Sequence, residues 1–516
     1  MSETDIKRLD AISQQDLLGL RRGIEKESLR VLPSGMLALS PHPASLGSAL
    51  THPHITTDFS ESQVELITGV HAGVEDCLQE LTEVHQAVYQ TLHALGQNPP
   101  EERLWVGSMP CGLPTDETIP LGRYGKSNVG RSKSVYRMGL GQRYGRRMQT
   151  ISGIHYNWSL PGVTSEQYFG LIRNFRRHSF LLLYLFGASP ALCSSFVAGR
   201  QHELQPLGEG SLHMPYGTSL RMGRLGYQSD AQSSLAVSYN SLESYAASLQ
   251  EALTRPYPAY EAIGVQNPGG DYNQLSTSLL QIENEFYGTI RPKRVIRSGE
   301  RPLHALRERG VEYVEVRCMD LDPFVPIGIA AQTVRFLDVF LLHCLTQPSP
   351  PDTPEEIRAL AHNQHRVAAH GRDPALRLQN VGGAAGTRSL VEWGAELLAQ
   401  CAPMAQALDA AHGGTAYAQA LAAACQTLAR AETTPSARML AVMRQDYQDS
   451  YVAFLREQSE QTRQQLLDLP YSAAQSARFE AQALASLAEQ QRIEAADTLD
   501  FESYRQQYLA PERMLV

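Results

Sequence analysis

Short runs in which acidic and apolar residues alternate constrain this chain more than any other feature. Glu25 and Glu27 stand two positions apart in RGIEKESLRV, and Glu315 alternates with valines in VEYVEVR. Successive side chains of a β-strand point to opposite faces, so each run predicts a strand with one apolar face and one charged face. The fold must therefore contain a sheet that presents acids on one side.

Three further segments carry acids or polar residues at regular spacing. LQIENEFYG and SGIHYNW show the same alternation and predict strands, whereas the four-residue spacing of Glu61 and Glu65 in ITTDFSESQVELIT is compatible with one helical face. The residues that these segments contribute are Asp58, Glu61, Glu65, His155, Asn157, Glu283, Glu285 and Tyr287.

Each segment taken singly is adequately interpreted as an ordinary solvated strand face. Together they place His, Asn and Arg beside the acids, rather than the Lys and Thr that are typical of a solvent face. Magnesium needs only a few carboxylates, completed by substrate phosphates and water, and no compact motif. The zinc motifs HExxH and CxxC do not occur in the sequence. The set therefore indicates an oxygen-ligand metal site.

Two basic segments offer candidate phosphate sites. Residues 123–147 combine many Lys and Arg residues with five glycines and no acid, and IRPKRVIRSGE follows the strand predicted at 283–287. Guanidinium groups and glycine amides can bind phosphate oxygens, although a solvated basic loop and an RNA-binding patch are the alternatives for 123–147. Phosphoryl transfer requires acidic side chains that hold a metal ion next to basic side chains that bind phosphate. The candidate phosphate- or nucleotide-binding residues are Arg131, Lys133, Arg291, Lys293 and Arg294.

Charge and hydropathy exclude several classes of protein. A net charge of −9 disfavours nucleic acid and anionic membranes as partners. The N-terminal residues lack the apolar run of a secretory leader, and FLLLYLFGA is far shorter than the roughly 20 residues of a membrane span, so it predicts a core segment. Seven scattered cysteines without a CxxC pair argue against a disulfide framework. We expect a cytoplasmic protein.

The chain divides near TQPSPPDTP. We predict a catalytic body over residues 1–345, a Pro-rich connection over 346–354 and a mainly helical region over 355–516. Helix starts are indicated at Thr353-Pro354 and Thr434-Pro435, and a helix end at Gly413-Gly414. The helical region is interpreted as cover for the body, with a partner-binding module as the alternative.

The amino-acid sequences of these segments resemble those of the proteobacterial family of glutamate-cysteine ligases, the first enzymes of glutathione synthesis. The resemblance rests on segments in family order: RGIEKESLRV, HPASLGSALTHPHITTDFSESQVELIT, YGKSNVGRSKSVYR, MQTISGIHYNWSLP, FGASPALCSSF, TSLRMGRLGY, LQIENEFYGTIRPKRVIRSGE, VEVRCMDLDPFVPIG and EAADTLDFESY. One departure is a short connection between SGIHYNWSLP and LIRNF, where some relatives carry an insertion. The C-terminal helical third matches less tightly.

This resemblance implies a fold and a set of residue roles. The fold is of the α+β class, an antiparallel sheet funnel similar to that of glutamine synthetase and the guanidino kinases, with surrounding helices and a helical C-terminal region. Arg221 and Arg317 face the transferred phosphoryl group or substrate carboxylates. The implied metal ligands are Glu25, Glu27, Asp58, Glu65, His155 and Glu315, and the implied substrate-binding residues are Tyr136, Gln149, Asn157, Tyr227 and Tyr287.

The resemblance also implies a reaction. The glutamate γ-carboxylate attacks the γ-phosphorus of ATP, and the amine of cysteine then displaces phosphate from the γ-glutamyl phosphate. Two or more Mg²⁺ ions, feedback binding of glutathione and a monomeric state are expected with it. The alternatives are another amide ligase or a phosphagen-type kinase that uses the same funnel, and a non-catalytic RNA-binding protein that uses residues 123–147.

Overall fold

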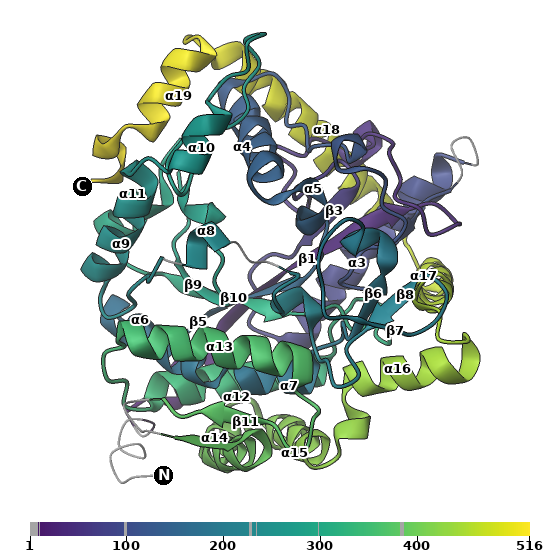
Figure 1. Cartoon of the computed structure of the whole chain (residues 1–516), viewed down its shortest axis with the longest axis vertical. Coiled ribbons are helices and arrows are strands. Elements are labelled where there is room, and N and C mark those ends of the chain that lie inside the picture. The colour runs from purple at the N-terminus through teal and green to yellow at the C-terminus, as the bar shows by residue number, and fades with distance from the viewer. Residues whose placement is uncertain are drawn as a thin grey trace.

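The centre of the molecule is one antiparallel sheet, seen in the computed structural model (Figure 1). The structure describes residues 9, 11–96, 101–226, 230–233, 235–297, 299–381 and 386–515. The strands run in the order β2-β3-β1-β5-β10-β9, and β4 pairs with the end of β1. Their bounds are β1 Arg21–Val31, β2 Ile55–Thr57, β3 Gln63–Ile67, β4 Arg103–Leu104, β5 Ile154–Ser159, β9 Ile290–Lys293 and β10 Tyr313–Met319.

The two faces of this sheet differ as the alternation predicts. Ile24, Val314 and Val316 are at most 1% exposed on the apolar face. That face packs on helices α3, α6, α7 and α12. Alternate residues of β1, β5 and β10 point the other way, so the strands predicted around Glu25, His155 and Glu315 are confirmed, with their charged side chains on one face.

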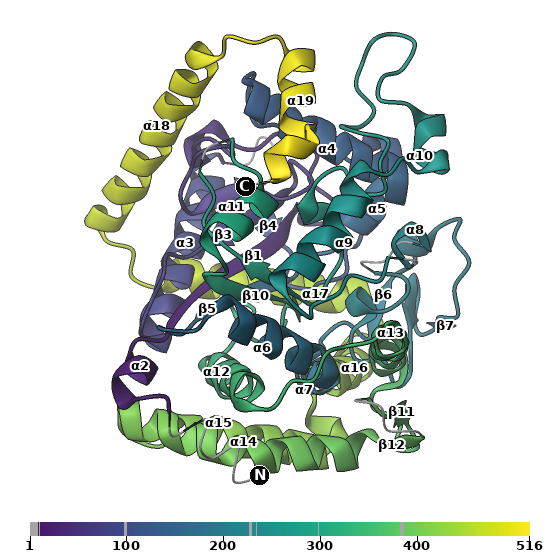
Figure 2. The same ribbon diagram turned by 90° about the vertical axis from the view of Figure 1, so that its left-hand side faces the viewer.

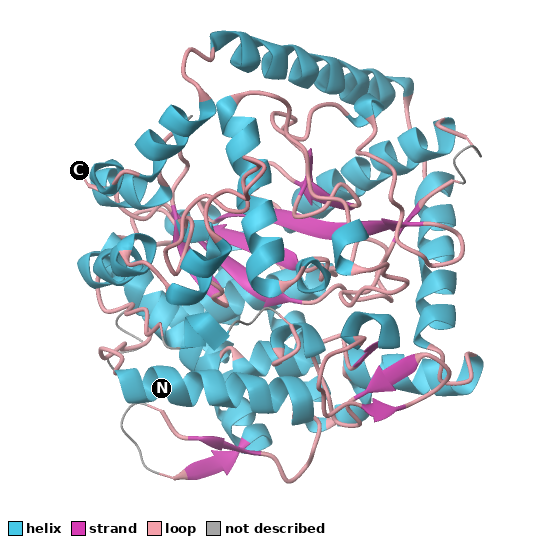
Figure 3. Ribbon diagram, turned by 45° about the horizontal axis from the view of Figure 1, so that its top comes forward, coloured by secondary structure: helices cyan, strands magenta, loops and turns pink. Residues whose placement is uncertain are grey.

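Helices surround the sheet (Figure 3), many of them from the first 346 residues. The expected core segment FLLLYLF forms the buried helix α7. The helix bounds are α2 Gln14–Leu18, α3 Val74–Ala94, α4 Asn128–Tyr144, α5 Arg146–Gln149, α6 Ser165–His178, α7 Phe180–Phe186, α8 Asp230–Ser233, α9 Leu242–Thr254, α10 Pro258–Ile263, α11 Pro302–Arg309 and α12 Ala331–Thr346. A small separate sheet is formed by β6 Ala191–Cys193, β7 Gln205–Pro206 and β8 Ser211–His213.

The rest of the chain is mostly helical and spreads over the sheet-containing body (Figure 2). Helices α14 and α15 pack with α12, α17 packs on α3, and α19 packs on α4. The bounds are α13 Pro354–His370, α14 Leu390–His412, α15 Ala416–Ala429, α16 Pro435–Asp446, α17 Tyr451–Asp468, α18 Ala473–Ala496 and α19 Phe501–Leu509, with a hairpin of β11 Arg377–Gln379 and β12 Thr387–Ser389.

The predicted helix ends in this region are confirmed. The Thr353 side chain accepts a hydrogen bond from the amide of Glu356 at the start of α13, and Thr434 caps α16 in the same way. Helix α14 stops at Gly413, whose φ of 82° suits glycine. No helix within the described residues is both long enough and apolar enough to span a membrane.

Two local predictions were wrong, and one segment without a predicted secondary structure is helical. Residues Glu283–Glu285 form a short 3-10 helix rather than a strand, because each glutamate turns to its own buried arginine. Glu61 lies in a turn, where its carboxylate accepts hydrogen bonds from the backbone amides of His42 and Arg123. It therefore shares no helical face with Glu65. The basic segment 123–147 is largely helical, forming α4 and α5. At Glu283, Glu285 and Glu61, long-range partners overrode the local spacing.

Candidate active site

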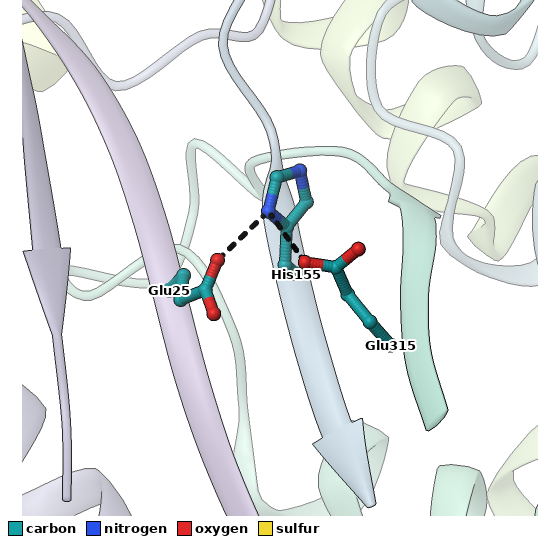
Figure 4. Close-up of side chains that lie close together, drawn as sticks. All are labelled: Glu25, His155 and Glu315. Carbon is teal, nitrogen blue, oxygen red and sulfur yellow. Dashed lines mark hydrogen bonds and ion pairs between the residues drawn. The ribbon is translucent and has the colours of Figure 1, made fainter. Parts of the chain in front are cut away.

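The register of three neighbouring strands brings Glu25, His155 and Glu315 together (Figure 4). Glu25 of β1 lies opposite His155 of β5, and Glu315 of β10 lies opposite Asn157 on the same face. His155 Nδ1 is 3.1 Å from Glu25 Oε2 and 3.9 Å from Glu315 Oε1. One ligand atom from each residue lies within 4.8 Å of the others. Ligands on opposite sides of a cation bound at about 2.1–2.5 Å stand about 4–5 Å apart, so one ion could contact all three.

A second group of acids adjoins this cluster. Glu27 of β1 lies opposite Glu65 of β3, and its Oε2 atom accepts a hydrogen bond of 2.8 Å from the Gly153 amide. Glu27 Oε1 is 3.8 Å from His155 Nε2, which links the two groups. Asp58 directly follows β2, and its backbone carbonyl accepts hydrogen bonds from Tyr124 and Arg137.

The acids of this second group repel one another. Burial and the charge of Asp58 raise the pKa of Glu27 to about 8. Burial and the charges of Glu25 and Asp58 raise the pKa of Glu65 well above its ordinary value. A cation between such acids relieves both effects, and several carboxylates with one imidazole suit Mg²⁺. The six predicted metal ligands therefore lie near one another, and three of them, Glu25, His155 and Glu315, could contact one divalent cation.

Cationic side chains occupy the neighbouring part of the same face. Lys293 Nζ lies 3.1 Å from Glu315 Oε1, and an Arg317 nitrogen donates to Glu315 Oε2 at 3.0 Å. Burial alone would raise the pKa of Glu315, but Lys293 and Arg317 hold that pKa well below its usual range. Arg291, opposite Glu315 in the register, is 6% exposed and donates to the carbonyls of residues 284 and 286. Glu315 thus joins the acids to a group of bases that could bind phosphate.

Arg221 supports the cationic group from a different element. It belongs to the 3-10 turn Leu220–Met222, is 1% exposed, and donates to the backbone carbonyl of Arg317 at 2.9 Å. Asp320 lies 3.9 Å away on its other side. A side chain at Gly153 would collide with the Arg221 guanidinium, so this glycine lets Arg221 approach the strand that carries His155.

Of the five predicted substrate-binding residues, the described ones lie around these charged groups. Gln149 donates to the Tyr287 hydroxyl at 2.9 Å, and Asn157 donates to Glu25 Oε1 at 2.9 Å. Tyr136 of α4 is half-buried, and burial together with the charge of Glu285 raises its pKa. Tyr227 lies outside the described residues.

Two predicted phosphate-binding residues are engaged elsewhere. The Arg131 guanidinium stacks 4.3 Å from the ring centre of Phe501 in α19, and Arg294 pairs with Glu312 at 3.6 Å. Lys133 instead remains beside the acids: burial and Arg137 lower its pKa to about 8, while Glu65 acts in the opposite direction. Arg137 itself was missed from the sequence, where nothing separates it from its seven basic neighbours in residues 123–147.

An antiparallel sheet face on which buried acids adjoin Lys and Arg side chains fits the class of enzymes that use a nucleotide. Residues 6–367 match the family described as glutamate-cysteine ligase. The chain is 46% identical to the glutamate-cysteine ligase of Alcanivorax borkumensis, over 97% of both chains, and 47% identical to that of Azotobacter vinelandii, over 99% of both. The chain therefore belongs to the glutamate-cysteine ligase family, and the resemblance seen in the sequence is confirmed.

Solved structures agree with this placement. The structure of a Francisella tularensis glutamate-cysteine ligase in complex with AMP matches with a TM-score of 0.89 at 36% identity, covering 96% of this chain and 98% of that one. A bifunctional glutathione synthetase from Pasteurella multocida matches with a TM-score of 0.69 at 25% identity, covering 97% of this chain and 59% of that one. The α+β class is thereby confirmed.

Proposed function

We propose that the protein joins the γ-carboxylate of glutamate to the amine of cysteine in two steps. The γ-carboxylate oxygen first attacks the γ-phosphorus of ATP, releasing ADP, and the cysteine amine then displaces phosphate from the resulting γ-glutamyl phosphate. The observation that carries this proposal is the shared sheet face on which Glu25, His155 and Glu315 adjoin Lys293 and Arg317. A carboxylate does not form an amide readily in water, so phosphorylation supplies the leaving group.

The residues of this face would have different roles in the reaction. Glu25, Glu27, Asp58, Glu65, His155 and Glu315 would hold Mg²⁺, which would supply charge neutralisation for the phosphates. Arg317 and Lys293 lie within 3.1 Å of Glu315 and can turn toward phosphoryl oxygens or the substrate carboxylate. Tyr136, Gln149 and Tyr287 would line the acceptor side. Arg291, buried among backbone carbonyls, holds the strand edge that presents Lys293.

Other features remain part of the same proposal. The acids on one face of an antiparallel sheet support a funnel of the glutamine synthetase and guanidino kinase type. The dense packing of α14, α15 and α17 against α12 and α3 supports helical cover for a body spanning residues 1–345. Glutathione, as a γ-glutamylcysteine derivative, would compete for the same site.

One product assay tests the reaction. Purified protein is mixed with glutamate, ATP and Mg²⁺, with and without cysteine, and the products are identified by mass. We expect γ-glutamylcysteine, ADP and phosphate only when cysteine is present. A phosphorylated product that accumulates without cysteine would favour a kinase, and an amide formed equally with other amines would favour a different ligase.

A further inference from the structure

A cavity of about 380 Å³ opens beside the reaction centre and continues beyond it. Arg317, Arg221 and Tyr287 line one part of the cavity, and residues of α6 and α13 line another. This volume lies within the range of roughly 300–1,000 Å³ that accommodates drug-sized ligands. It exceeds what a single small amino acid fills. We name the part between α6 and α13 the acceptor arm, defined by Arg176, Arg358, Leu360 and Gln364.

Guanidinium groups line this cavity and can bind a carboxylate, and each of them also pairs with an acid outside the lining: Asp352, Asp320, Glu315 or Glu355. Four arginines, two of them in the acceptor arm, are among the described residues that line it, and none of those residues is Asp or Glu. The Arg176 guanidinium is held in place by Asp352 at 3.2 Å and by the ring of Tyr239, whose centre is 4.7 Å away. Its side chain is only 18% exposed. A guanidinium that is already oriented loses little freedom when it binds a carboxylate.

The direction of the proposed reaction decides which end of an acceptor enters the arm. The acceptor amine must reach the phosphorylated γ-carboxylate beside Glu315 and Arg317. The carboxyl end of the acceptor therefore points away from these residues, past Arg221 and toward α13. For cysteine the chain ends there, but the cavity continues.

We infer that the acceptor arm binds a carboxyl-terminal extension of the acceptor, so that the enzyme also accepts peptides with an N-terminal cysteine. The inference rests on the proposed function. With cysteinylglycine, the peptide amine would form the amide bond to the γ-carbonyl carbon of γ-glutamyl phosphate, the carbon–oxygen bond to phosphate would break, and the amine proton would pass to solvent. ATP supplies the phosphoryl group as it does for cysteine, and the product is a γ-glutamyl tripeptide.

The test compares two acceptors in the full-length protein with glutamate, ATP and Mg²⁺. Cysteinylglycine and cysteine are supplied separately, and products are identified by mass while initial rates give kcat/KM for each. Arg358→Ala is the principal variant, because its ion pair with Glu355 is exposed and contributes little to folding. Arg176→Gln is the second variant. Arg492→Ala is the matched control, since Arg492 forms a similarly exposed pair with Glu489 far from the cavity in α18.

We expect the tripeptide to form with the unaltered protein. The ratio of kcat/KM for cysteinylglycine to that for cysteine should fall severalfold in Arg358→Ala and about tenfold or more in Arg176→Gln, as expected for loss of a charge-assisted hydrogen bond. Arg492→Ala should leave both values unchanged. Normal cysteine turnover without any tripeptide would overturn the inference, as would an unchanged ratio in both arm variants. Absence of product with either acceptor would instead refute the proposed function, and the inference with it.

Discussion

Glu283 and Glu315 have similar surroundings in the sequence but different surroundings in the structure, and exchanging each for alanine should separate a structural acid from a functional one. Glu283 is 6% exposed and accepts hydrogen bonds from Arg301 Nε at 3.1 Å, from a terminal Arg301 nitrogen at 2.8 Å and from the Leu303 amide at 3.2 Å. Glu315 instead lies between Lys293 and Arg317 on the face that carries His155.

The magnitudes follow from these contacts. Glu283→Ala leaves the buried Arg301 without its carboxylate, and breaking a buried ion pair costs about 3–5 kcal/mol. For a chain of this length we expect the melting temperature to fall by about 5 °C or more. Glu315→Ala also breaks ion pairs, but their partners Lys293 and Arg317 have side chains that are 27% and 24% exposed and can be solvated, so we expect a smaller loss of stability. Its expected effect is loss of turnover by about a hundredfold or more, as for removal of a group that stabilises transition-state charge.

Thermal unfolding and ligase activity of both variants, measured at several Mg²⁺ concentrations below the melting temperature, check this reasoning. Glu283→Ala should keep the magnesium dependence of the unaltered protein. Glu283→Gln is a milder substitution that keeps part of the hydrogen bonding. Its melting temperature should lie between those of the unaltered protein and Glu283→Ala. A variant at Glu283 that melts normally but needs far more Mg²⁺, or a fully active Glu315→Ala, would refute the assignment of roles.

Three further predictions concern the metal, the phosphate side and pH. Glu25→Ala should abolish Mg²⁺-dependent activity without unfolding the protein, because Glu25 faces the site rather than the core; full activity at ordinary Mg²⁺ would contradict this. Arg317→Lys should lower kcat by about a hundredfold, since an ammonium cannot reproduce the guanidinium fork, and unchanged steady-state kinetics would assign Arg317 a structural role. His52 Nδ1 accepts the amides of His54 and Ile55, and burial lowers the pKa of His52 to about 4, below the 6.5 of an unfolded histidine. The stability due to neutral His52 is present above pH 6.5 and is lost as the pH falls toward 4. His52→Asn keeps a hydrogen-bond acceptor but does not titrate, so between pH 7 and 5 its free energy of unfolding should rise by about 1 kcal/mol relative to that of the unaltered protein, after allowance for solvent screening. Equal changes of melting temperature with pH in both proteins would argue against this prediction.

Local patterns in the sequence were sufficient for several parts of this structure. Alternation around Glu25, His155 and Glu315 predicted strands whose acids share a face, because side chains of a strand alternate by geometry alone. Thr353 and Thr434 predicted helix starts for an equally local reason, since a capping side chain bonds to an amide only three residues away. The amino-acid sequences of the same segments identified the family.

Tertiary structure decided which of many similar residues form the site. Glu285 and Glu315 alternate with apolar neighbours in the same way, yet Glu285 meets Arg143 and Tyr144 whereas strand pairing carries Glu315 to His155. Arg131 and Lys133 stand two positions apart, but Arg131 stacks on Phe501, some 370 residues away. Partners so distant in the chain leave no local periodicity, and the acceptor arm between α6 and α13 exists only once two separate helices have packed beside the sheet.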